Sequence, residues 1–256
     1  MHRSYHFFDM STFAARLFSL FALLCLATAC DSEPAKKRPP PPDSPSTACP
    51  NERELGEDES ARRGVLHGDV SGDGRRDEVF LAVDEGAERG CRALLFVADQ
   101  GKRSAASLDV EETDLSLGLP AISGLKQIDG LDGAEIVVDM AAGASTFFAG
   151  VFVFVDGSLE QVRIDQSQPP TENLFAYGGG VGQLSAADCA ADGAIVISTA
   201  VPEGRRYRVD RHSYTFDGIV IARDPSKDET HRRRLGTIPR SFPEFAGPPF
   251  SSCPDA

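Results

Sequence analysis

The stretch GDVSGDGRRDEVFLAV, residues 68–83, places a loop of aspartate and glycine directly before an apolar run. Glycine allows the backbone to turn tightly, and aspartate side chains favour turns by bonding to nearby backbone groups. The apolar run consists largely of β-branched and aromatic residues, which favour extended structure. The stretch therefore predicts a turn that leads into a β-strand.

Two landmarks of this region recur along the chain at nearly one spacing. The start of the apolar run, 77–80, is matched by 135–138, which lies 58 residues later, and by 194–197, a further 59 residues on. The end of the next apolar run is matched in the same way, at 96–99, 154–157 and 215–218. Recurrence at a fixed period indicates repeated structural units.

The predicted fold is all-β. Strand-like runs occur at 79–83, 93–97, 136–138, 151–155, 195–197 and 219–221. We expect three four-stranded antiparallel units, at about 60–118, 119–176 and 177–224, followed by a C-terminal tail, 225–256. Because closed propellers usually have about four blades or more, three units predict a partial or distorted β-propeller-like arrangement, with a barrel or a sandwich as the alternative.

The loop before the first apolar run has the donor spacing of a calcium site. Side-chain oxygens stand at positions 1, 3, 5 and 9 of the loop, on Asp69, Ser71, Asp73 and Asp77, and Arg75 stands at position 7. Calcium takes six to eight oxygen ligands from a loop that curls around it, and position 7 gives its backbone carbonyl. The sequence therefore predicts a structural Ca²⁺ at Asp69, Ser71, Asp73, Arg75 and Asp77, against the alternative of a plain Gly/Asp turn.

These residues resemble the FG-GAP/VCBS repeats of integrin-alpha-type β-propellers, in which a loop close to Asp-x-Asn-Gly-Asp-Gly-x-x-Asp precedes an apolar strand. The resemblance covers residues 68–83. Only remnants of the loop stand at 128–135 and 188–193. The resemblance implies a propeller-like scaffold used for adhesion, ligand binding or surface display, with calcium as a structural staple.

The N-terminus has the features of an export signal. Residues 17–27 are uncharged, too short to span a bilayer as a helix, and Leu26-Ala27-Thr28-Ala29-Cys30 resembles the lipobox of bacterial lipoproteins. We expect a lipoprotein signal peptide over 1–29, lipidation of Cys30, a Pro-rich tether over 30–48 and a β-repeat domain over 49–256. The protein would then be lipid-anchored in the bacterial cell envelope, facing the periplasm or the exterior. An ordinary secretory signal cleaved near Ala29 is the alternative.

Four cysteines remain after Cys25 and Cys30. An even number in an exported chain predicts two disulfides, and four cysteines allow three connectivities. We favour Cys49–Cys253, which would tie the ends of the domain together, with Cys91–Cys189 inside it.

The net charge and the catalytic motifs that the sequence lacks limit the classes of function to consider. A formal net charge of −13 argues against a nucleic-acid partner. The sequence contains no nucleophile elbow, phosphate-binding loop or dinucleotide fingerprint. We therefore expect a non-enzymatic binding or structural module with a protein or glycan ligand. Residues 143–148 put small polar residues beside two phenylalanines, which indicates either a carbohydrate or peptide contact or a turn with core phenylalanines. The alternative is an envelope hydrolase that uses the loop from Asp69 to Asp77.

Overall fold

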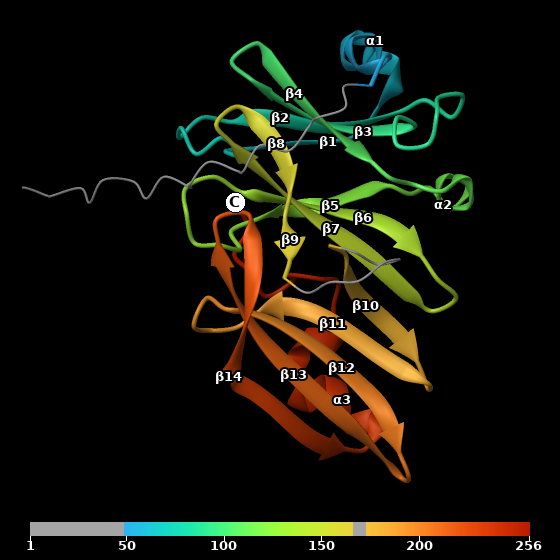
Figure 1. The fold of residues 1–256 in the computed structure, drawn as a ribbon, viewed down its shortest axis with the longest axis vertical. Coiled ribbons are helices and arrows are strands. Elements are labelled where there is room, and N and C mark those ends of the chain that lie inside the picture. The colour runs from blue at the N-terminus through green and yellow to red at the C-terminus, as the bar shows by residue number, and fades with distance from the viewer. Residues whose placement is uncertain (1–48, 166–172) are drawn as a thin grey trace, which may run out of the picture. The chain divides into compact units, whose positions relative to one another are not determined.

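The computed structural model describes residues 49–165 and 173–256 (Figure 1). The fold is all-β, as the sequence predicts, and its strands pair antiparallel except for β9 (Arg163–Ile164) and β14 (Val220–Arg233), which pair parallel with each other. The signal peptide, Cys30 and the Pro-rich tether lie outside the described residues.

The first sheet is a four-stranded antiparallel meander. Its strands are β1 (Arg62–Gly68), β2 (Asp77–Val83), β3 (Ala93–Asp99) and β4 (Lys102–Leu108), in that order. Helix α1 (Glu52–Glu57) and the turn η1 (Glu59–Ala61) precede it, and α2 (Glu112–Ser116) follows it. The strands within the first predicted unit thus form one continuous sheet.

The second sheet has ten strands. Nine follow the order β5-β6-β7-β10-β11-β12-β13-β14-β9, and β8 pairs with β7 beside this path. Their bounds are β5 (Ala121–Lys126), β6 (Glu135–Ala142), β7 (Thr146–Val155), β8 (Ser158–Gln161), β9 (Arg163–Ile164), β10 (Phe175–Gly180), β11 (Gln183–Cys189), β12 (Ile195–Glu203), β13 (Arg206–Asp217) and β14 (Val220–Arg233).

The repeat is visible in this sheet, but its units are not separate. The meander β1–β4 recurs as β5–β8 and as β11–β14, so that β2, β6 and β12 are equivalent strands. Strand β7 is long enough to pair with β8 through residues 152–155 and with β10 through residues 146–149. The second and third units are therefore fused through β10, so that the three predicted units form two sheets. Strand β14 also runs to Arg233, past the predicted boundary at 224.

The hydrophobic core has two main parts because β6 and β7 are covered on both faces. Ile136 and Val138 of β6 pack with side chains of β2 and β3, including Leu81 and Leu95. Val137, between them in sequence, points to the other face and joins the second cluster. That cluster contains Phe175 of β10, Ile195 of β12 and, from the C-terminal tail, Phe250 and Cys253. Strand alternation thus divides one sheet between two cores.

The disulfide pairing favoured from the sequence is wrong. The sulfurs of Cys49 and Cys91 are 2.01 Å apart, and those of Cys189 and Cys253 are 1.99 Å apart. Both bonds tie a flanking segment to the sheet beside it. Next to Cys49, the Asn51 side chain donates to Asp84, which follows β2. In the tail, Phe250 N–H donates to the carbonyl of Ala187 in β11, which brings Cys253 to the end of that strand.

The chain after β14 covers the end of the long β12–β14 hairpins. Its turns are η2 (Leu235–Thr237), α3 (Ile238–Ser241) and η3 (Pro243–Phe245). Glu244 is buried there and accepts from Arg211 Nε at 2.8 Å and from Ser198 Oγ at 2.9 Å. On the exposed side, hydrogen bonds from His231 and then Arg211 hold the pKa of Glu229 below its ordinary value of 4.5.

In the described parts of the chain, none of the helices has the length and apolar character needed to cross a membrane.

Candidate functional site

The predicted calcium loop connects β1 to β2, the place that the sequence assigns it. Gly72 and Gly74 have φ angles of +75° and +80°, in the left-handed region that favours glycine. A Cβ at Gly72 would lie 2.8 Å from the carbonyl oxygen of Asp132 in the second unit, whereas a Cβ at Gly74 would meet nothing. Gly72 is therefore required for the close approach of the Asp132 backbone as well as for the turn.

Asp69 curls the loop around its own carboxylate. Oδ1 accepts from the backbone N–H groups of Gly72 at 2.8 Å and Asp73 at 3.1 Å, and Oδ2 accepts from that of Gly74 at 2.8 Å. Three converging amides are a strong attraction for a negative charge. The side chain at loop position 1 thus organises the turn.

Asp77 closes the loop from its far end. Its side chain is 2 % exposed, and Oδ2 accepts from the N–H groups of Val70 at 2.9 Å and Ser71 at 2.8 Å. The second unit repeats the device, because the buried Glu135 accepts from the N–H groups of Ile128 and Asp129. An acid at the start of β2 and of β6 therefore has the same role of holding the preceding loop.

The other two predicted side-chain ligands, Ser71 and Asp73, face the β3–β4 turn. Asp73 Oδ1 accepts from Arg75 N–H at 2.9 Å, and Oδ2 accepts from Gln100 Nε2 at 2.8 Å. Ser71 Oγ is a buried atom without a hydrogen-bond partner, and Asp99 Oδ1 is another. Both residues line the same hollow as Asp73. The sequence did not point to Gln100 or Asp99, because nothing local shows that the next hairpin folds back onto the loop.

The loops of the first and second units pack against each other. Ala134 N–H donates to the carbonyl of Asp69 at 2.8 Å, and a Cβ at Gly133 would lie 2.6 Å from the carbonyl oxygen of Val70. A hollow of about 600 Å³ lies between the loops, with Asp69 and Asp73 on one side and Asp132 on the other. The remnant loop of the second unit is thus a support for the first.

The fit of these residues to calcium is partial. The loop has the curl, the left-handed glycines and a buried unsatisfied oxygen on Ser71. However, Asp69, Asp73 and Asp77 accept backbone amides, and within residues 49–165 and 173–256 no three His, Cys, Asp or Glu side chains are grouped so that they could hold a metal ion. The loop contains oxygen ligands suited to calcium, but they do not point toward one common position. Calcium binding would therefore require some of these carboxylates to turn inward.

The third remnant has a different role. Asp188 is 2 % exposed, and its Oδ1 accepts from the N–H groups of Cys189 and Ser252. It therefore anchors the C-terminal tail beside the Cys189–Cys253 bond.

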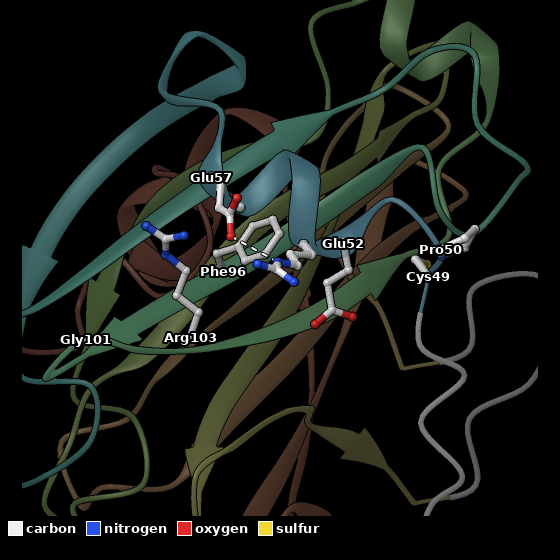
Figure 2. Close-up of a pocket in the computed structure, with 9 residues that line it drawn as sticks. Cys49, Pro50, Glu52, Glu57, Phe96, Gly101 and Arg103 are labelled. Carbon is white, nitrogen blue, oxygen red and sulfur yellow. Dashed lines mark hydrogen bonds and ion pairs between the residues drawn. The ribbon is translucent and has the colours of Figure 1, made fainter.

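A third hollow, of about 560 Å³, lies between α1 and the β3–β4 hairpin. Figure 2 shows Glu52, Glu57 and Arg103 around it, with Phe96 at its base. The Phe96 ring is 2 % exposed and stacks on Phe80, with centroids 5.0 Å apart. The ring is therefore committed to the core, and the hollow presents mainly charged side chains to solvent.

The chain matches no family model, no curated protein and no solved structure. The resemblance to FG-GAP/VCBS repeats thus stays a prediction that rests on residues 68–83.

Proposed function

We propose that this protein is a lipid-anchored, non-enzymatic binding or structural module of the bacterial cell envelope, with a calcium ion as a staple of its loop from Asp69 to Asp77. The observation that carries the proposal is the curled loop with Ser71 Oγ buried and unpartnered, because a cation would satisfy that atom. Two disulfides in the domain also fit an exported protein.

Calcium would be held by the side chains of Asp69, Ser71 and Asp73 and by the carbonyl of Arg75. Asp77, which already fixes the loop, would supply further negative charge from the buried side. Such an ion would join the β1–β2 loop to the β3–β4 turn, since Gln100 of that turn already binds Asp73. Its role would be to stiffen one end of the first sheet.

Thermal melting in excess calcium and in EDTA tests the staple. An ion that binds only the folded chain at about ten times its Kd raises the free energy of unfolding by about 1.4 kcal/mol, which is a shift of about 3–6 °C for a domain of this size. Asp73→Ala should abolish the shift, whereas Asp217→Ala, at an exposed aspartate of the β13–β14 turn, should retain it. Equal melting temperatures in calcium and EDTA would refute the staple.

Membrane fractionation tests the anchor separately. Cys30→Ser removes the thiol that lipidation needs, so the chain should move from the membrane pellet to the soluble fraction. Cys25→Ser is the matched control, because that residue lies inside the predicted signal peptide, and it should leave retention unchanged. A Cys30→Ser chain that still pellets with membranes would contradict the anchor.

A further inference from the structure

An aromatic pair lies on the second sheet, far in sequence from the metal loop. Phe147 of β7 and Tyr177 of β10 are directly opposite in the strand register. Their rings are stacked, with centroids 5.5 Å apart and planes inclined by 28°. Phe147 is 42 % exposed, although a phenylalanine opposite another ring ordinarily belongs in a core. Both residues project from the face of the sheet that carries the core residues Phe175 and Ala149. The pair therefore lies at the edge of that core, where Phe147 is exposed.

A carboxylate is fixed beside the rings by two hydroxyl groups. Tyr177 Oη donates to Asp139 Oδ1 at 2.8 Å, and Ser123 Oγ donates to Asp139 Oδ2 at 2.6 Å. Burial, and then the bond to Asp139, raises the pKa of Tyr177, so that it remains a donor. Asp139 forms no ion pair within residues 49–165 and 173–256. Each of its oxygens therefore keeps lone pairs that a hydroxyl-bearing ligand can use.

The backbone clears the space around the rings. Gly178 has a φ of +80°, and a Cβ there would lie 3.7 Å from the Phe147 ring. Gly179 has a φ of +120°, and a Cβ there would lie 2.2 Å from the carbonyl oxygen of Gln183. Gly178 thus leaves the space beside the exposed ring without a side chain, whereas Gly179 allows the close approach of β11. The strand register also shifts near Ser123 and near Asp139, and such β-bulges redirect side chains.

The size and chemistry of the surface select the ligand. Phe147 is the one aromatic side chain among the large hydrophobic residues exposed in the described parts of the chain, so the exposed aromatic surface consists of a single ring, whereas a stable protein interface covers about 1,000 Å² or more. An exposed ring beside a carboxylate without an ion pair suits a small ligand with one apolar face and a rim of hydroxyl donors. A pyranose ring has this form, because its C–H groups lie on one face and its hydroxyl groups point outward.

The geometry points to a carbohydrate-binding subsite formed by Phe147, Tyr177 and Asp139, in which a pyranose stacks on Phe147 and donates hydroxyl groups to Asp139. This inference rests on the proposed role as a binding module and names its ligand class. Ser123 and Tyr177 position the carboxylate, and Gly178 leaves room for the sugar.

Calorimetric titration of the full chain tests the inference, in a detergent without a sugar headgroup. The probes are hexasaccharides of β-1,4-linked glucose, α-1,4-linked glucose and β-1,4-linked N-acetylglucosamine. At least one should bind saturably with a Kd in the millimolar range or tighter, as a single exposed subsite allows. Phe147→Ala and Asp139→Asn should each weaken binding by about tenfold.

Val65→Ala is the matched control, because Val65 is 43 % exposed but lies on β1 of the other sheet. It should leave the Kd unchanged, and melting curves should show that every variant is folded. No saturable binding of any probe, or equal binding by Phe147→Ala, would overturn the inference. Calcium-dependent melting and membrane retention are measured separately, so an absence of sugar binding would leave the proposed function standing. A loss of calcium-dependent melting or of membrane retention, with sugar binding intact, would refute the staple or the anchor alone.

Discussion

The acid at the start of β2 offers the sharpest test of how the loop is built. Asp77→Ala removes an acceptor from two backbone N–H groups, one fully buried at Val70 and one partly buried at Ser71. Leaving the buried donor unsatisfied costs about 1–3 kcal/mol, and the partly buried one costs less because water reaches it. The sum is about 3 kcal/mol, which corresponds to a fall in melting temperature of about 6–12 °C.

The free energy of unfolding is measured by urea titration in EDTA. Calcium binding then does not contribute, and the variants are compared for hydrogen bonding alone. Asp77→Asn keeps one carbonyl acceptor and should cost about 1 kcal/mol. Asp132→Ala, at an exposed aspartate in the facing loop, is the matched control and should change the free energy of unfolding by less than about 0.5 kcal/mol. A loss below about 1 kcal/mol for Asp77→Ala would refute the reasoning, since it would mean that the two amides have other partners.

Two further changes test other parts of the fold. Replacing Cys189 and Cys253 by serine opens a loop with a sequence separation of 64 residues, so unfolding should become easier by about 4 kcal/mol in the chain-entropy model, and a non-reduced digest of the unaltered chain should yield that linked pair. An unaltered chain with Cys253 linked to Cys49 would contradict the structure. The pKa of Glu229 is held below 4.5 in the folded chain, so its contribution to stability is present above that pH and is lost as the pH falls through the lower folded value. Below pH 4.5, the melting temperature of Glu229→Gln should therefore fall less steeply with decreasing pH than that of the wild type, and equal slopes would contradict this.

Six strands, β2, β3, β6, β7, β12 and β14, could be predicted because each carries its own local signal. The runs at Val79 and Ile136 are β-branched, lie directly after Gly/Asp turns and recur at one period, and they form the equivalent strands β2 and β6. The curl of the loop at Asp69 was equally local, since the spacing of glycine and aspartate specifies it.

What the sequence did not reveal depends on contacts between distant segments. The cysteines were assigned on the idea that a disulfide ties the two ends together, but each flanking segment packs on its nearest sheet, as the bond from Phe250 to Ala187 illustrates. The fusion of two units through β10 depends on the length of β7, which no turn signal marks. The Phe147–Tyr177 pair likewise arises only from strand register.

The most direct test of the proposed staple is a calorimetric titration of the full chain with calcium. We expect one ion bound per chain, with binding lost in Asp73→Ala and kept in Asp217→Ala. Heats no larger than those of dilution, or equal binding by the two variants, would contradict a calcium staple in the loop from Asp69 to Asp77.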